Sequence, residues 1–168
     1  MKLSYLLNPG EVINSEVRNS FPVIGLAVSG VSFTGFFLLT GLDNQNGFFF
    51  PAIKGLLFGT LGIAFLAVII WLIVKGLNNG NKLEHVIGSF SLCYTTTMIF
   101  TFLGLFLKLI LGWNTSVSLG MSGMLFAFSP MISVITSFTG GKRFLDVVII
   151  TFAGMYVILF WALLNQML

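Results

Sequence analysis

Polar residues recur along one apolar segment at the spacing of a helix face, and they are the first place to look for chemistry. One stands at every fourth position: His85, Ser89, Cys93, Thr97 and Thr101. Residues four apart lie one above another on an α-helix, so these five form a polar stripe on one helix. Such side chains either bond a neighbouring helix across a tight contact or line a polar cleft for a ligand or ion. The sequence leaves both interpretations open.

The residues of the stripe do not make a catalytic or metal-binding set. His85 is the only histidine and Cys93 the only cysteine, whereas a metal site needs several histidine, cysteine or carboxylate ligands. A serine nucleophile needs an adjacent base, and the sequence shows no group that would orient His85 for that task. We therefore expect no enzymatic activity, no metal and no other cofactor.

Further small and hydroxyl residues are expected at contacts between helices. The three glycines of a GxxxG pattern and its extension favour close helix contact, either within one bundle or between two copies. A run of serines in the segment 117–138 is expected to face the polar stripe, with a proline that removes one backbone donor and kinks the helix. The residues expected at these contacts are Gly55, Gly59, Gly62, Ser122, Ser129, Pro130 and Ser133.

The composition indicates that the chain lies in a lipid membrane rather than in water. Of its 168 residues, 57% are hydrophobic and 8% are charged, against about 25% charged residues in an ordinary soluble domain. A soluble globule, a disordered chain and a disulfide scaffold are excluded. A helix needs about 20 apolar residues to cross the hydrocarbon core. Five stretches meet this length, and the expected fold class is an all-α polytopic membrane helix bundle with spans at residues 21–41, 55–74, 86–107, 117–138 and 147–168.

Basic residues set the expected orientation, because cytoplasmic loops carry more lysine and arginine. With the N-terminus in the cytoplasm, the inside holds six of them, namely Lys2, Arg18, Lys75, Lys82, Lys142 and Arg143. The outside then holds Lys54 and Lys108, and an odd number of spans leaves the C-terminus outside. Scattered charges with a net value of +3 form no stripe for nucleic acid. We expect an integral protein of a bacterial plasma membrane.

Residues 1–20 are expected to form a short amphipathic helix on the cytoplasmic face, separate from the membrane domain of residues 21–168. Asn8 suits an N-cap, Pro9 the first helical position and Glu11 the third, which together make a capping box. An amphipathic helix of this kind lies in the membrane interface; the alternative is a capped extension of the first span. Pro9, Glu11 and Arg18 are the residues expected to contact a cytoplasmic partner.

Three local features accompany the five-span plan. Leu6-Leu7-Asn8-Pro9 precedes the first span, and Gly80-Asn81-Lys82 follows the second. Gly88-Ser89-Phe90 and Cys93-Tyr94 then stand near the start of the third. With these features the chain resembles the YIP domain family, the Ypt/Rab-interacting membrane proteins and their bacterial relatives, and above all its small bacterial-type members. The resemblance implies an adaptor without catalytic residues.

Two functions follow as expectations. The first is a non-enzymatic membrane scaffold or adaptor that binds the lipid bilayer and another membrane protein or a second copy, with a transporter or GTPase system as its setting. The alternative is the solute-binding membrane subunit of an importer. Its pocket would lie between the polar stripe and the serines of the fourth span, with Pro130 between them.

Overall fold

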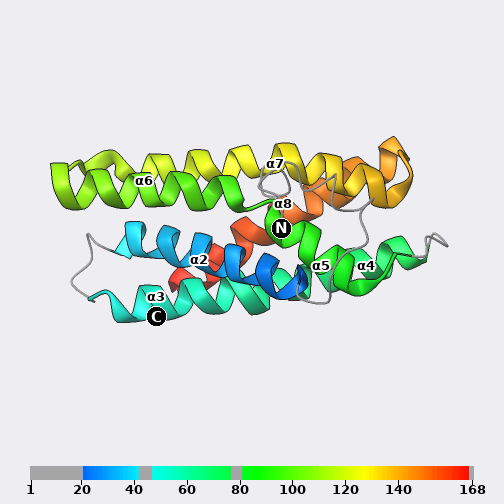
Figure 1. The fold of residues 1–168 in the computed structure, drawn as a ribbon, viewed down its shortest axis with the longest axis horizontal. Helices are drawn as coiled ribbons and strands as arrows, with labels where there is room; N and C mark the ends of the chain where they lie inside the picture. The colour runs from blue at the N-terminus through cyan, green and yellow to red at the C-terminus, as the bar shows by residue number, and fades with distance from the viewer. Residues whose placement is uncertain (1–20, 42–46, 77–80, 167–168) are drawn as a thin grey trace.

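The computed structural model of the chain describes residues 21–41, 47–76 and 81–166. Over these residues it consists of helices and contains no strand. Five spans are long and apolar enough to cross a membrane, and they lie side by side along one direction (Figure 1). The spans are α2 (Phe21–Gly41); α3 (Phe49–Leu57), η2 (Phe58–Gly62) and α4 (Ile63–Lys75); α5 (Leu83–Leu92) and α6 (Thr95–Leu111); α7 (Val117–Thr139), preceded by the turn η3 (Asn114–Ser116); and α8 (Arg143–Gln166). The prediction of an all-α membrane bundle is confirmed.

The ends of the spans follow local chemistry more than hydropathy. Two of them end at glycines in the left-handed conformation, Gly112 at φ +63° and Gly140 at φ +69°, which other residues adopt at a cost. The second span begins at Phe49 rather than at residue 55, and Pro51 lies in its first turn, where its missing N–H breaks no helical hydrogen bond. The second and third spans are therefore longer than expected.

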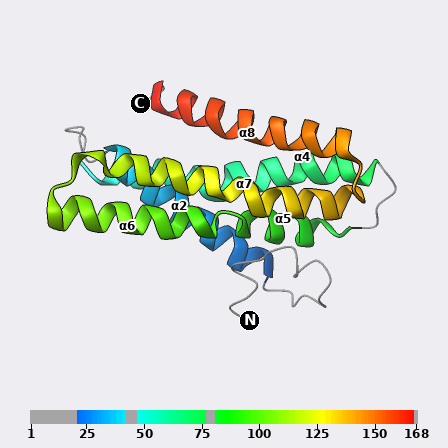
Figure 2. The same cartoon turned by 90° about the horizontal axis from the view of Figure 1, so that it is seen from above.

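Helix α2 occupies the middle of the bundle, with the second span on one side and the third on another (Figures 1 and 2). A Cβ atom at Gly25 would lie only 2.7 Å from the carbonyl oxygen of Gly88 in α5. Farther along α2, the Ser32 hydroxyl donates a 2.9 Å hydrogen bond to the carbonyl of Tyr94. Small residues of α2 thus let three spans approach at backbone distance, as is typical of helix contacts in lipid.

The GxxxG glycines pack within the bundle. A Cβ atom at Gly55 would lie 2.5 Å from the Cα atom of Thr34, and one at Gly59 would lie 2.5 Å from the carbonyl oxygen of Ser29. Both glycines therefore face α2. The alternative expectation, that the GxxxG pattern joins two copies of the chain, is wrong. Gly62 contacts a different span, because its carbonyl accepts a 3.2 Å hydrogen bond from the Tyr156 hydroxyl of α8.

The third and fourth spans meet along α6 and α7, and a glycine forms the closest contact. A Cβ atom at Gly123 would lie 2.9 Å from the Cα atom of Thr97. The Thr97 hydroxyl donates a 3.0 Å hydrogen bond to the Gly123 carbonyl, and the Thr96 hydroxyl reaches the same carbonyl at 3.5 Å. This contact is a close-packed seam that leaves little room for a polar cleft at Thr97.

Helix α8 crosses one side of the bundle, where it contacts α7 and α4 (Figure 2). At its start Asp146 is buried, with 7% of the residue exposed. Its carboxylate accepts hydrogen bonds from the hydroxyls of Thr139 and Thr136 at the end of α7. Threonines of the preceding span therefore satisfy this carboxylate. The basic pair next to it, Lys142 and Arg143, is exposed.

The expected N-terminal helix lies outside the described residues. Pro9, Glu11 and Arg18, proposed from the sequence as the cytoplasmic contact, fall in residues 1–20, and so do Lys2 and the capping residue Asn8. These expectations stay predictions.

Candidate functional site

The third span is broken near its middle, where the sequence predicted one continuous helix. Helix α5 ends at Leu92 and α6 begins at Thr95. Between them the N–H groups of Cys93 and Tyr94 bond carbonyls three residues back, at 3.2 and 3.3 Å. The four-residue pattern resumes when the Met98 N–H bonds the Tyr94 carbonyl at 3.0 Å. In a membrane span, such a break is tolerated only where the backbone is buried in protein or lines a cavity.

Hydroxyl side chains around the break compete for the backbone groups that a continuous helix would use. The Thr95 hydroxyl donates to the Leu92 carbonyl at 2.7 Å, and the Cys93 thiol contacts the Ser89 carbonyl at 3.3 Å. The Tyr94 carbonyl has a second donor, the Ser32 hydroxyl of α2. These bonds satisfy the carbonyl groups that the break exposes, so the backbone at the break is a stable feature of the core.

Among the described residues, three side-chain hydroxyls next to the break are buried and have no hydrogen-bond partner. They belong to Ser89, Ser91 and Tyr94, and none of these residues is more than 2% exposed. A buried hydroxyl without a partner loses the hydrogen bonds that it made to water, at a cost of about 1–3 kcal/mol. Such groups are uncommon in native proteins and often mark a bound water, ion or ligand.

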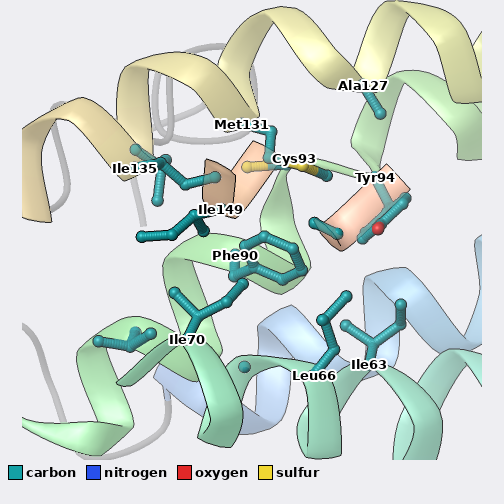
Figure 3. Close-up of a cluster of buried hydrophobic side chains, with 14 of the residues drawn as sticks. Ile63, Leu66, Ile70, Phe90, Cys93, Tyr94, Ala127, Met131, Ile135 and Ile149 are labelled. Atoms are coloured by element: carbon teal, nitrogen blue, oxygen red, sulfur yellow. The ribbon is translucent and has the colours of Figure 1, made fainter. Parts of the chain in front are cut away.

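Two other spans carry a π-helix or a proline next to core residues that surround the break. The π-helix η2 interrupts the second span just before Ile63, and Pro130 lies inside the continuous helix α7 just before Met131. Figure 3 shows Cys93 and Tyr94 in the middle of this core, with Met131 on one side and Ile63 on the other. Since π-helical turns and buried helix breaks are frequent at functional sites, this depth of the bundle is the candidate site.

The polar stripe predicted from the sequence does not form one cleft. His85 is half-buried at the start of α5, and Cys93 is fully buried. Thr97 is bonded to α7, whereas the hydroxyl of Thr101 turns back to the Met98 carbonyl at 2.9 Å. The break also shifts the residues before it relative to those after it. Of the five, Ser89 alone presents a buried hydroxyl without a partner among the described residues.

The serines of the fourth span lie on the opposite side of α7 from the seam. Their positions fall within about 100° of arc on one helix face, and we call them the α7 serine row: Ser118, Ser122, Ser129, Ser133 and Ser137. All are exposed except Ser122, which is half-buried. The side of α7 that faces the bundle carries Gly120, Gly123, Ala127, Met131 and Val134 instead. The expectation that Ser122, Ser129 and Ser133 face the third span is therefore corrected.

The physical reason is that the close contact needs residues smaller than serine, and α7 supplies glycine at the seam. Two serines of the row donate to their own helix: Ser122 to the Ser118 carbonyl and Ser137 to the Ser133 carbonyl, both at 2.9 Å. Pro130 is half-buried beside the row. Because proline has no N–H, the carbonyl of Phe126 lacks its usual helical donor, and Phe126 is 57% exposed. Polar groups of α7 thus face the space around the bundle.

Three aromatic side chains that pack in or against the core were not predicted as site residues. They are Tyr94, Tyr156 and Trp161, which stand in apolar segments and read as core or belt residues. A tyrosine or tryptophan inside a predicted span is itself a usable signal, because its polar tip needs a partner when it is buried.

Comparison with protein-family models, with curated proteins and with solved structures finds no match to this chain.

Proposed function

We propose that this chain is a non-enzymatic membrane adaptor of the YIP type, which binds another membrane protein or a second copy of itself within the bilayer. The observation that carries the proposal is the α7 serine row, which points away from the bundle. Serine hydroxyls are common where two membrane helices meet, because they permit close approach and bond across the contact.

A partner helix would bind most strongly at the centre of the α7 serine row. Ser129 and Ser133 are exposed one turn apart. The Phe126 carbonyl, which lacks its usual helical donor because Pro130 has no N–H, lies one turn before Ser129. In lipid an unpaired carbonyl has no water to bond. A partner helix that carries hydroxyl or amide side chains would supply the missing donors and accept from the two serines.

Basic residues at the span ends support the orientation in the proposal. Lys75, Lys82, Lys142 and Arg143 are exposed where α4 ends and where α5 and α8 begin, and these points lie at the same end of the bundle (Figure 2). Lys54 and Lys108 belong to the opposite half, where the Lys108 ammonium reaches the Leu39 carbonyl at 3.5 Å. The richer end is the cytoplasmic one in our proposal, and a bacterial plasma membrane is the setting.

Gentle purification from native membranes tests the proposal. The wild-type chain is compared with the double variant Ser129→Leu and Ser133→Leu, and with a matched double variant on α8, Leu159→Phe and Leu163→Phe. The residues of the control are also exposed, at 58% and 54%. We expect one stoichiometric membrane protein, or a dimer, with the wild type and the α8 variant, and its loss with the α7 variant. Equal recovery from all three would reject the row as the interface.

The alternative, a solute-binding membrane subunit, loses its predicted pocket, because Ser129 and Ser133 lie outside the bundle. It retains one observation, the buried hydroxyls without partners at the break in the third span. That observation is independent of the adaptor proposal.

A further inference from the structure

A chain of aromatic rings runs beneath α8, from the break in the third span to the fifth span. Tyr94 packs on Phe33 of α2 at a centroid distance of 4.9 Å, and Phe33 packs on Phe58 of η2 at 4.6 Å. Phe58 stacks on Phe160 of α8 at 5.2 Å, and Phe160 stacks on Tyr156 at 5.5 Å. We call this set, together with Phe36 and Trp161, the aromatic seam.

Two polar tips in the aromatic seam have no hydrogen-bond partner within the part of the chain that the structure describes. They are the Tyr94 hydroxyl and the indole N–H of Trp161, and both atoms are buried. Tyr94 as a whole is 98% buried, since 2% of it is exposed. The third tip, the Tyr156 hydroxyl, is bonded to the Gly62 carbonyl. The aromatic seam therefore holds two buried hydrogen-bond donors that no described residue satisfies.

The two donors lie against the same face of α2. Tyr94 packs on Phe33, and Trp161 packs on Phe36 at a centroid distance of 6.3 Å. Phe33 and Phe36 are three residues apart, so the two contacts are separated by about 5 Å along the helix axis. The two aromatic side chains that carry the donors thus lie about one helical turn apart along α2.

Helix α8 is the element that would admit a small molecule to these donors. Its span has the smallest buried share of the five, 11% against 33% or more for the others. It packs mainly on α7 and α4 and reaches α2 and η2 through the rings of Trp161 and Phe160, whereas α2 packs on the second, third and fourth spans. Over the aromatic seam α8 is held by ring packing and by the single Tyr156 hydrogen bond. Separation of α8 from the bundle there opens the aromatic seam to lipid.

The donors and their surroundings indicate the chemistry of the ligand. A tryptophan N–H only donates, and a tyrosine hydroxyl can donate, so the ligand must present acceptor oxygens. The walls are aromatic rings, which favour a flat unsaturated molecule. The basic side chains of the described residues belong to the ends of the spans, so an anion would find no counter-charge in the aromatic seam. We propose that the aromatic seam binds a flat, uncharged, membrane-soluble molecule with carbonyl acceptors, of the quinone class, which enters beneath α8.

The test uses the purified full chain in detergent and a matched pair of probes. Menadione is a methylated naphthoquinone, and methylnaphthalene has the same ring skeleton without the carbonyl groups. Binding is measured as the rise in unfolding temperature with ligand concentration, since a ligand that binds only the folded state stabilises it. We expect saturable stabilisation by menadione and at least tenfold weaker binding of methylnaphthalene.

Two variants then assign the site. Tyr94→Phe and Trp161→Phe should each weaken menadione binding roughly five- to tenfold, the effect of one lost hydrogen bond. Tyr94→Phe should leave the unliganded protein as stable as the wild type, because it removes a hydroxyl that has no partner. The control Tyr156→Phe removes a hydroxyl that bonds Gly62, so it should lower stability without the ligand.

Three outcomes would overturn the proposal. They are equal binding of the two probes, no saturable binding of menadione, and a high-resolution structure with an ordered water bridging the Tyr94 hydroxyl to the protein. A variant that does not fold is replaced by the other, because Tyr94 and Trp161 lie on different spans. None of these results depends on whether the α7 serine row binds a protein.

Discussion

Gly59 and Ser29 lie at backbone distance across the first two spans. The Ser29 hydroxyl donates a 2.6 Å hydrogen bond to the Gly59 carbonyl, and a Cβ atom at Gly59 would lie 2.5 Å from the Ser29 carbonyl oxygen. Both groups are buried. The contact leaves no space for any other residue at position 59, and it fixes the second span on α2.

Gly59→Ile should therefore destabilise the monomer itself. Overpacking a core contact costs about 1–3 kcal/mol, and we expect the upper end because backbone atoms on α2 cannot move aside. The measurement is reversible unfolding in mixed micelles. Gly76→Ala is the control, since its nearest neighbour would lie 3.4 Å away at the end of α4. A Gly59→Ile protein of normal stability that no longer self-associates would restore the intermolecular interpretation.

The hydrogen bond from Thr97 to Gly123 yields a second prediction. Thr97→Val keeps the shape of the side chain and removes its 3.0 Å bond to the Gly123 carbonyl, so it should lower the free energy of unfolding by about 1 kcal/mol. Ser129→Ala changes a hydroxyl on the outer face of α7 and should leave monomer stability unchanged. If the two variants had the same effect, the assignment of the two faces of α7 would be incorrect.

The carboxylate of Asp146 should be energetically coupled to Thr139, whose hydroxyl it accepts. A double-mutant cycle with Asp146→Asn and Thr139→Val measures this coupling from the free energies of unfolding. We expect a coupling energy of about 1 kcal/mol or more, since the effects of substitutions within one hydrogen-bond network are not additive. Lys142→Gln is the control, because the basic pair does not satisfy the carboxylate in this structure. Strict additivity of the Asp146 and Thr139 effects would contradict the contact.

Cys93 should be protected from reagents as long as the break in the third span stays closed. The thiol is fully buried, so a membrane-permeant maleimide should label it only after the protein unfolds. A Lys75→Cys variant in a Cys93→Ala background is the reference, because position 75 is exposed at the end of α4. Labelling of native Cys93 at the rate of the reference would mean that the break opens readily.

Hydropathy was sufficient to predict the number of spans and the whole of the first. Residues 21–41 form one helix as expected, because a run of apolar residues in lipid has to satisfy its backbone internally. Hydropathy could not place the start of the second span at Phe49, since Lys54 and Pro51 resemble a loop to a scale that scores each residue separately.

Helical spacing showed which residues share a face but not what the face contacts. The serines of α7 do fall on one face, yet Gly120 and Gly123 hold the seam with α6. Hydroxyl residues are common both at helix contacts inside a bundle and at contacts with a partner, so the sequence alone could not distinguish these two.

The break at Cys93 and Tyr94 depends on contacts that no local pattern contains. The Ser32 hydroxyl, 62 positions away in the chain, bonds the Tyr94 carbonyl, and this bond requires α2 to be in place. The density of hydroxyl residues from Ser89 to Thr97 is the one local hint, because such side chains compete with the helical hydrogen bonds.

Photo-crosslinking from the α7 serine row in native membranes tests the proposed function most directly. A benzophenone amino acid replaces Ser129 in one protein and Leu159, on the exposed face of α8, in another. We predict that position 129 captures one defined protein, either a second copy at twice the mass of the chain or a single membrane partner, and that position 159 captures lipid. Capture of lipid alone from position 129, or the same products from both positions, would contradict the assignment of the row as an interface.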